Sequence, residues 1–160
     1  MFTAKSPDEL PDTATMLAMS GLEFMQAVLR GEFARPPISV ALNYTLDSVK
    51  DGEVAFRGTP DFSHTNPMGG THGGWYGTLL DSCMACAVMT KIPRGSYYTT
   101  LEYKVNLVRA IPLGTEIVAT GYSDHAGRST GVAHGEIRGA LDKKLYATGS
   151  TTCLIMTARS

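Results

Sequence analysis

The chain has 160 residues, of which 43% are hydrophobic and 18% charged, a composition that fits one globular domain and excludes a disordered chain. The formal net charge is −1 and there is no block of Lys and Arg, so we expect no binding of nucleic acid through its phosphates. Three cysteines, an odd number, argue against a disulfide framework, and residues 1–6 lack a signal-peptide core, so we expect a reduced, cytoplasmic setting.

The N-terminal part of the chain predicts an arm followed by one short helix. Residues 1–14 carry two prolines among acidic side chains and are predicted to be a loose arm. Ser20 has the position of a helix N-cap, and Glu23 completes a capping box. Apolar residues follow at helical spacing, so residues 21–30 are predicted to be an amphipathic helix that ends at Gly31.

The next segment predicts a β-hairpin and a long loop. Residues 38–49 are a half-apolar extended stretch, and residues 53–59 have the pattern of its returning strand. Asp51-Gly52 between them is a strong hairpin turn. Residues 60–71, rich in Pro, Gly, Asn, His and Ser, form the loop that follows.

Residues 72–89 are the stretch around which the rest of the chain is organised. Two glycines open it, and no further proline or glycine interrupts the run between Gly77 and Pro93, which predicts a helix of about four turns. Its residues are apolar on most sides, so the helix is predicted to be buried, and it is too short to span a membrane. Asp81 lies within this helix, and its presence there requires an explanation, since burying an unpaired charge costs free energy.

The remaining chain predicts four strands in an antiparallel meander. Their ranges are 98–109, 115–123, 129–138 and 145–156. The expected fold class is therefore α+β, with an antiparallel sheet wrapped around one long central helix and an extra short N-terminal helix. We expect residues 1–35 to form the arm and short helix, and residues 36–160 a single domain.

The start of the central helix and its acidic residue are the candidates for chemistry. A helix N-terminus presents unpaired amides and partial positive charge, so Gly73 and Gly74 could polarise a carbonyl, or could simply end a loop and allow tight packing. Asp81 could act as a general base or nucleophile. Alternatively, it caps a helix that begins at Ser82 or pairs with a basic group.

Helix geometry separates these two candidates. Gly73 and Asp81 are eight positions apart, about 12 Å along a helix, and at roughly 3.6 residues per turn they point about 80° apart. One chain is therefore not expected to bring both to the same carbonyl. If both act on one substrate, a second copy of the helix must lie antiparallel nearby, which predicts a homodimer with its sites at the interface.

Neither the cysteines nor the histidines predict a metal site. Cys83 and Cys86 match a C-x-x-C pattern, but they lie inside the apolar run, lack a second ligand pair and do not follow a strand, so we expect core residues. His64 and His72 are expected to be polar loop residues that hydrogen-bond to the backbone.

Two stretches resemble the signature of the hotdog-fold acyl-CoA thioesterases of the PaaI type. They are Asn66-Pro67-Met68-Gly69-Gly70-Thr71-His72-Gly73-Gly74 and Leu79-Leu80-Asp81. Residues 99–109, 127–130 and 147–152 are similar to strands of that family, and the likeness covers about residues 36–156. The resemblance implies a hotdog fold with five or six strands, homodimers that often pair into tetramers, and hydrolysis of acyl-CoA without a metal or a separate cofactor, CoA being part of the substrate.

The resemblance also implies roles for individual residues. Asp81 would activate water or attack the thioester carbonyl, and Gly73 N–H of the other subunit would polarise that carbonyl. Asn66 and His72 would line the site, and Thr100, or its neighbour Thr99, would hold the water. The CoA arm would run near three further residues, with Arg109 and Lys143 as weaker phosphate candidates. These three are Arg128, Ser129 and Thr130.

Two other functions and the acyl group stay open at this point. A hotdog dehydratase or hydratase acting on acyl thioesters pairs a His with an acid at a different spacing, and a non-catalytic acyl-CoA-binding module would not need Asp81. Some relatives carry Glu at the acid position and a hydroxyl residue one turn later, where this chain has Ala85. An aryl or medium-chain acyl pocket could be lined by residues whose alternative role is the core. They are Trp75, Tyr76, Met84, Met89 and Tyr98.

Overall fold

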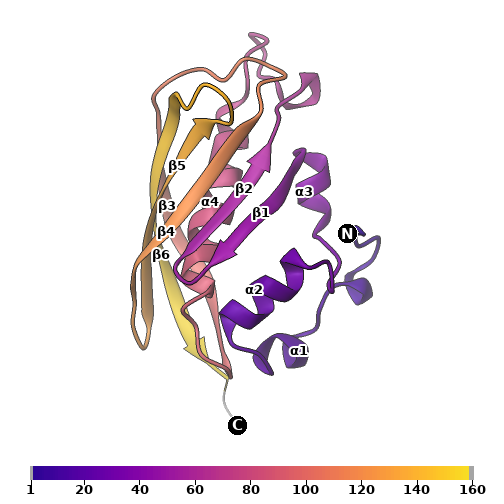
Figure 1. The fold of residues 1–160 in the computed structure, drawn as a ribbon, viewed down its shortest axis with the longest axis vertical. Coiled ribbons are helices and arrows are strands. Elements are labelled where there is room, and N and C mark those ends of the chain that lie inside the picture. The colour runs from indigo at the N-terminus through magenta and orange to yellow at the C-terminus, as the bar shows by residue number, and fades with distance from the viewer. Residues whose placement is uncertain (1, 159–160) are drawn as a thin grey trace.

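The computed structural model describes residues 2–158, so Met1 and the last two residues of the expected domain lie outside the described residues. Six strands form one antiparallel sheet: β1 (Tyr44–Lys50), β2 (Glu53–Gly58), β3 (Ser96–Leu107), β4 (Ile117–Ala126), β5 (Thr130–Gly139) and β6 (Leu145–Thr157). The sheet packs around one long helix, α4 (Gly73–Met89), as Figure 1 shows. The predicted α+β architecture is confirmed.

The core lies between α4 and the sheet. Leu79, Leu80 and Met84 of α4 are fully buried, which explains why the helix is apolar on most sides. Glycines on the sheet let the helix approach closely, because a Cβ at Gly121 would lie 2.3 Å from the carbonyl oxygen of Cys83. Close packing therefore fixes α4, and Asp81 with it, relative to the strands.

The first hairpin is confirmed, but its first strand is shorter than predicted. Lys50 pairs with Glu53 across the turn, and Gly52 has the positive φ of 78° that the turn requires. The expected strand over residues 38–49 begins instead with a short helix, α3 (Pro37–Ala41), and β1 starts only at Tyr44. A proline at the first helical position favours a helix, because its φ angle is already helical. The prediction of a strand relied on the alternating apolar pattern and did not take this proline into account.

The predicted meander is only partly correct. Strands β4, β5 and β6 are consecutive neighbours, but β3 pairs with β6 and the sheet order is β1-β2-β4-β5-β6-β3. The connection after β3 therefore crosses from one edge of the sheet towards β2, which pairs with β4. A turn signal marks where a strand ends and carries no information on which strand comes next in the sheet.

The N-terminal segment (residues 2–36) is folded against the rest and is not the loose arm expected for residues 1–14. It contains a 3-10 turn η1 (Pro7–Glu9) and two helices, α1 (Thr13–Leu17) and α2 (Gly21–Leu29). Thr3 bridges to Arg35, and Ala4 is buried. These contacts join positions about thirty residues apart, so local composition could not reveal them.

Helix α2 confirms the predicted capping box and position. The Ser20 side chain accepts from the Glu23 amide, and the Glu23 carboxylate accepts from the Ser20 amide. The Gly21 amide donates to Ile92 O at 2.9 Å, which ties the start of α2 to the segment after α4. In Figure 1, α1, α2 and α3 lie together on the β1 side of the molecule.

Candidate active site

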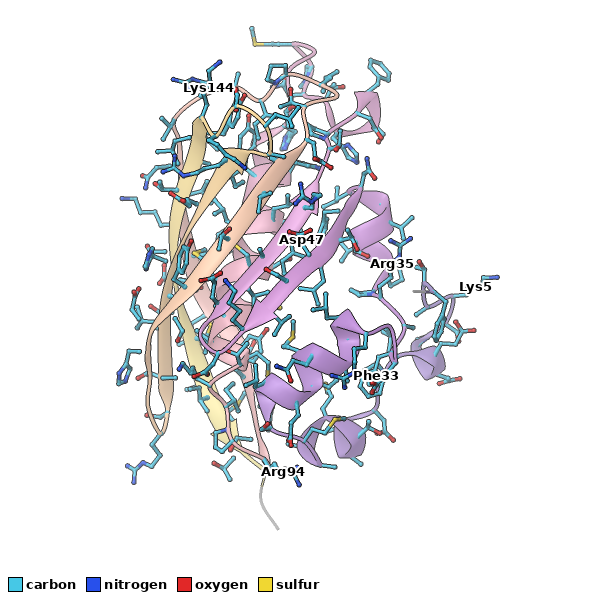
Figure 2. The ribbon with its side chains drawn as sticks, viewed as in Figure 1. Lys5, Phe33, Arg35, Asp47, Arg94 and Lys144 are labelled. Carbon is cyan, nitrogen blue, oxygen red and sulfur yellow. The ribbon has the colours of Figure 1, made fainter. Side chains whose placement is uncertain are left out.

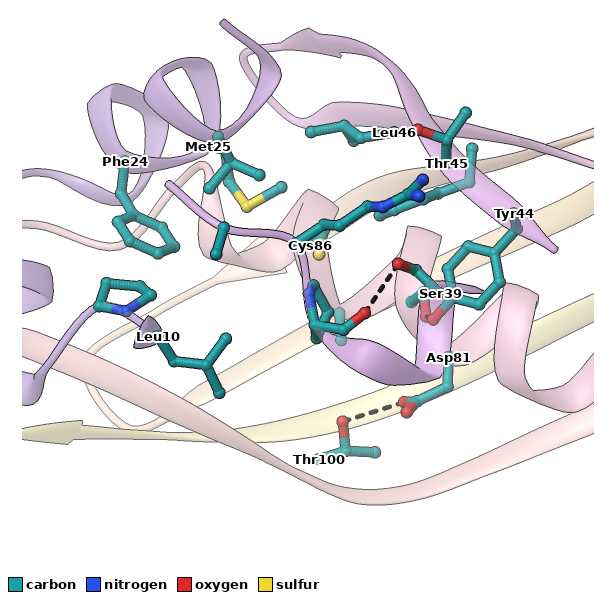
Figure 3. A pocket seen from close by; sticks show the side chains of 18 of the residues that line it. Leu10, Phe24, Met25, Ser39, Tyr44, Thr45, Leu46, Asp81, Cys86 and Thr100 are labelled. Atoms are coloured by element: carbon teal, nitrogen blue, oxygen red, sulfur yellow. Dashed lines mark hydrogen bonds between the residues drawn. The ribbon is translucent and has the colours of Figure 1, made fainter. Parts of the chain in front are cut away.

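Asp81 lies in the middle of α4 with its carboxylate half-buried. Thr100 Oγ1 of β3 donates a hydrogen bond to Asp81 Oδ1 at 3.0 Å, as Figure 3 shows. Burial raises the pKa of the Asp81 carboxyl above its ordinary value, and the Thr100 hydrogen bond partly opposes this rise. The result is a carboxylate that is more basic than a free one, as general-base catalysis requires.

The Asp81 carboxylate faces a cavity of about 360 Å³ with a predominantly apolar lining. Helix α4 and strand β3 supply one wall, which includes Asp81, Cys86, Tyr98 and Thr100. A cavity of this size, apolar apart from a few polar groups, is typical of a small-molecule site.

The N-terminal segment supplies the opposite wall of this cavity. Phe24, Met25 and Val28 of α2 line it, together with Leu10 and Arg35. This role was not predicted from the sequence. An amphipathic helix outside the expected core was the available signal, because its apolar face must be buried against something.

The predicted acyl-pocket residues belong almost entirely to the core. Trp75, Tyr76, Met84 and Met89 are buried at 6% exposure or less and do not line the cavity, whereas Tyr98 does. Because α4 is apolar on most sides, its sequence could not show which side faces the cavity.

The loop before α4 holds two predicted site residues in structural roles. Asn66 Oδ1 accepts from the amides of Met68 and Gly70, at 2.9 and 3.2 Å, and so fixes the tight loop. His72 is the N-cap of α4, where its Nδ1 accepts from the Gly74 amide at 2.9 Å. Both side chains shape the entry to the helix and lie outside the Asp81 cavity.

The amide of Gly73 is the exposed first N–H of α4. Within residues 2–158 no acceptor is placed on it. Gly73 lies beside Leu107 near the end of β3, whereas Asp81 lies beside Thr100, seven positions earlier on that strand. One chain therefore brings Asp81 and Thr100 together and leaves Gly73 apart from them, as the helix geometry predicted.

The candidate CoA residues lie on the turn between β4 and β5. Arg128, Ser129 and Thr130 are exposed. Thr130 of β5 pairs with Leu154 of β6, and Leu154 pairs on its other side with Thr99 of β3. Thr130 is thus two strands, about 10 Å, from β3 and outside the Asp81 cavity.

The weaker phosphate candidates are also exposed. Arg109 follows the end of β3, and its carbonyl accepts from Tyr76 Oη at 3.4 Å. Lys143 Nζ, in the turn before β6, donates to Ala140 O at 2.7 Å. Arg109 is therefore the one of the two that lies near the start of α4.

The cysteines and His64 show no metal-binding arrangement. Burial raises the pKa of Cys86 to about 12 and raises the pKa of Cys83 as well, so both stay protonated thiols at neutral pH. His64 is buried, and its Nε2 lies 2.9 Å from Ala41 O. In the part of the chain that the structure describes, no three His, Cys, Asp or Glu side chains are grouped as ligands, and no helix could cross a membrane.

Comparison with known proteins finds a family to which part of the chain is similar. The family model of the thioesterase superfamily matches residues 68–144, which include the start of α4, Asp81 and Thr100. Over these residues the chain is similar to the thioesterase superfamily. It is 30% identical over 89 residues to acyl-coenzyme A thioesterase 13 of Mus musculus, covering 56% of this chain and 63% of that protein. The human acyl-coenzyme A thioesterase 13 is 27% identical over 108 residues, covering 68% and 76% of the two chains.

Solved structures show that this chain has the hotdog fold. A phenylacetic acid degradation-related protein from Ralstonia eutropha superposes with a TM-score of 0.73 at 26% identity, covering 82% of this chain and 98% of that one. A hypothetical thioesterase from Streptococcus pneumoniae, solved with coenzyme A, gives 0.67 at 27% identity, covering 77% and 93%. Almost a fifth of this chain thus extends beyond the fold that it shares with the Ralstonia protein.

Proposed function

We propose that this protein is a member of the thioesterase superfamily and hydrolyses acyl-CoA thioesters to a free acid and CoA. The observation that carries the proposal is the Asp81 carboxylate, which has a raised pKa, accepts from Thr100 and faces an apolar cavity. The acyl group occupies the cavity, which leaves the thioester carbon at the Asp81–Thr100 end. The acyl-coenzyme A thioesterases of mouse and human support CoA as the leaving group.

Asp81 acts in this reaction as a general base or as a nucleophile. As a base, the ionised carboxylate takes a proton from water while the water oxygen attacks the thioester carbon; collapse of the tetrahedral intermediate breaks the C–S bond, and the CoA thiolate takes up a proton. As a nucleophile, the carboxylate attacks the same carbon, and the C–S bond breaks so that the CoA thiolate leaves and takes up a proton. Water then hydrolyses the acyl-enzyme anhydride, which releases the free acid and restores the carboxylate. The Thr100 hydroxyl, which donates to Asp81, keeps lone pairs that can accept from the water.

The oxyanion donor comes from a second copy of the chain across β3. β3 is an edge strand, and several of its large apolar side chains are exposed, which is typical of an edge that pairs with another chain. These side chains include Leu101 (57%), Tyr103 (47%) and Leu107 (56%). A two-fold axis crossing β3 near Lys104 would lay Leu107, and Gly73 beside it, against the partner subunit's Thr100.

This homodimer would bring the free Gly73 amide to the Asp81 site of its partner. Backbone amides at a helix N-terminus stabilise the oxyanion that forms during attack. Asn66 and His72 would then line the site by holding the loop that presents Gly73. Pairing of two such dimers into a tetramer stays a prediction.

We also infer where the CoA arm and the protein lie. Arg128, Ser129 and Thr130 form an exposed polar turn that can take the phosphates, with Arg109 as a further candidate. Coenzyme A in the Streptococcus pneumoniae structure supports binding of this ligand by the shared fold. The three free cysteines support a reduced, cytoplasmic setting.

Replacing the carboxylate by an amide tests the proposal. Asp81→Asn keeps the size of the side chain, and we expect thiol release from a panel of acyl-CoAs to fall by about 10³-fold with folding intact. Asp124→Asn is the matched control, because Asp124 is an exposed acid on β4 that pairs with His134. Undiminished activity of the Asp81→Asn variant would overturn the proposal, and so would binding of acyl-CoA by the wild type without any turnover.

No observation favours the hydratase alternative. Such an enzyme needs a His near the acid, and no His lines the Asp81 cavity in the part of the chain described by the structure. His72 Nδ1 is already engaged by the Gly74 amide. Water addition to an enoyl thioester without thiol release would be the contrary result.

A further inference from the structure

Arg35 is a half-buried cation on the N-terminal wall of the cavity. Its Nε donates to Thr3 Oγ1 at 2.7 Å, which uses one of the five N–H groups of the guanidinium. Within residues 2–158 no carboxylate lies within 4 Å of it, and no acceptor is placed on its two terminal nitrogens. Nearby Arg57 differs, because it pairs with both Asp47 and Glu116.

An unpaired guanidinium beside an apolar cavity is energetically unfavourable without a partner. Burial removes part of its hydration, and most of the cavity lining is apolar, with Leu10, Phe24 and Met25 among its members. Backbone bonds hold the residue in place: the Arg35 amide donates to Phe2 O at 2.9 Å, and its carbonyl accepts from the Ala4 amide at 3.1 Å. The cation is therefore fixed at this wall, which Figure 2 places at the junction of α3 and the N-terminal segment.

The cavity thus carries one carboxylate and one guanidinium, which come from different segments of the chain. Asp81 and Thr100 lie on the α4–β3 wall, and Arg35 lies on the wall built by the N-terminal segment. No ion pair joins Arg35 to Asp81, so the guanidinium does not serve to hold the catalytic carboxylate. An acyl group whose thioester carbon reaches Asp81 would extend across apolar surface towards Arg35.

We propose that Arg35 is a specificity-determining residue that binds a terminal carboxylate of the acyl group. The preferred substrates are then CoA thioesters of dicarboxylic acids, with an apolar chain between the thioester and the free carboxylate. Guanidinium and carboxylate match in geometry and charge, and hydrogen bonds between charged groups are the stronger kind. This inference rests on the proposed hydrolysis and assigns the acyl class of the same site.

Paired substrates that differ only at the far end of the acyl chain test the inference. We expect wild-type kcat/KM to be higher for adipoyl-CoA than for hexanoyl-CoA, both six-carbon acyl groups. Arg35→Met keeps the stem and removes the charge, and should lower the adipoyl-to-hexanoyl ratio of kcat/KM by about 10-fold or more. Arg35→Lys, which keeps the charge, should restore part of the ratio.

Thr3→Val is the matched control. It removes the acceptor of Arg35 Nε and keeps the guanidinium, so it reports on any loosening of the N-terminal segment. We expect the ratio to stay near the wild-type value in Thr3→Val, with thermal unfolding measured for each variant.

Three outcomes would overturn the inference while hydrolysis itself stands. One is an equal fall for both substrates in Arg35→Met, which indicates damage to the segment or a contact to CoA; adipoyl-pantetheine, which lacks the nucleotide, separates these two. Another is that kcat/KM of Arg35→Met stays at the wild-type value for both substrates. The third is a wild-type preference for hexanoyl-CoA. Absence of thiol release from every substrate would instead remove the proposed function.

Discussion

The middle of α4 and its N-terminus differ in how much of the site one chain completes. At the middle, Asp81 has its hydrogen-bond partner, a raised pKa and a predominantly apolar cavity, all supplied by the same chain. At the N-terminus, Gly73 is exposed, and its amide has no acceptor among the described residues. We call the Asp81–Thr100 region of the helix the built half and the Gly73 amide the open half.

The difference is what we expect if the open half is completed by a second copy of the chain, as proposed. Backbone groups are normally satisfied, so an exposed helix N-terminus beside an apolar strand edge is ready for a ligand or a partner. Gly73 needs no side chain for this role, and a Cβ there would meet only Leu107 Cδ1 at an ordinary 3.5 Å. The following predictions change one half at a time.

The largest expected effect comes from deleting the Gly73 amide. Gly73→Pro removes the N–H and adds a pyrrolidine ring, which the fold should accept because proline suits the first helical position and His72 already has extended backbone angles. We expect kcat to fall by about 10²- to 10³-fold with folding intact. Gly73→Ala keeps the amide and should retain most of the activity.

Mixing variants shows whether the two halves come from different chains. Asp81→Asn and Gly73→Pro, each nearly inactive, are expected to regain about one quarter of wild-type activity after subunit exchange, because each mixed dimer contains one intact site. No recovery after proven exchange would place both groups in one chain.

A substitution that weakens pairing of two chains across β3 is expected to lower activity, because the Gly73 amide would no longer reach the partner's site. Tyr103→Arg puts a charge near the proposed two-fold axis, so the dimer should dissociate and activity should fall more than about 10-fold at low protein concentration. Tyr97→Arg is the control, since Tyr97 is 40% exposed on the same strand but lies beyond the proposed overlap. Sedimentation and a dilution series of activity measure both; equal behaviour of the two variants would contradict the proposed interface.

A smaller effect is expected in the built half from Thr100→Val. The Thr100 hydrogen bond lowers the pKa of Asp81, so its loss raises that pKa further. Activity requires the ionised carboxylate and is lost as pH falls through the pKa, so the acid limb of the kcat/KM profile should move to higher pH, with kcat about 10-fold lower. Thr99→Val, on the opposite face of β3, should leave the profile unchanged; an unmoved limb in Thr100→Val would contradict the role of the hydroxyl.

The smallest effect is expected from His72→Ala. It removes the cap on the Gly74 amide and should lower the free energy of unfolding by about 1 kcal/mol. His72→Asn supplies another capping side chain and should retain both stability and activity, measured by denaturant titration and thiol release. Loss of activity in a stable His72→Asn would give this histidine a direct catalytic role.

The sequence by itself determined the buried helix with its acid, the capping box of α2 and the first hairpin. These features depend on the spacing of apolar residues and on interactions between residues a few positions apart, so they can be read from the sequence alone. It also determined that Gly73 and Asp81 could not meet within one chain, because the rise and rotation of a helix are fixed.

The tertiary structure alone decided the place of β3 in the sheet and the second wall of the cavity. Strand order and the contact between residues 2–36 and α4 join positions far apart in sequence, and no local pattern encodes such distances. The same holds for Arg35, an ordinary surface type in the sequence, which becomes an unpaired cation at an apolar cavity only when Thr3, Phe24 and Asp81 are assembled around it.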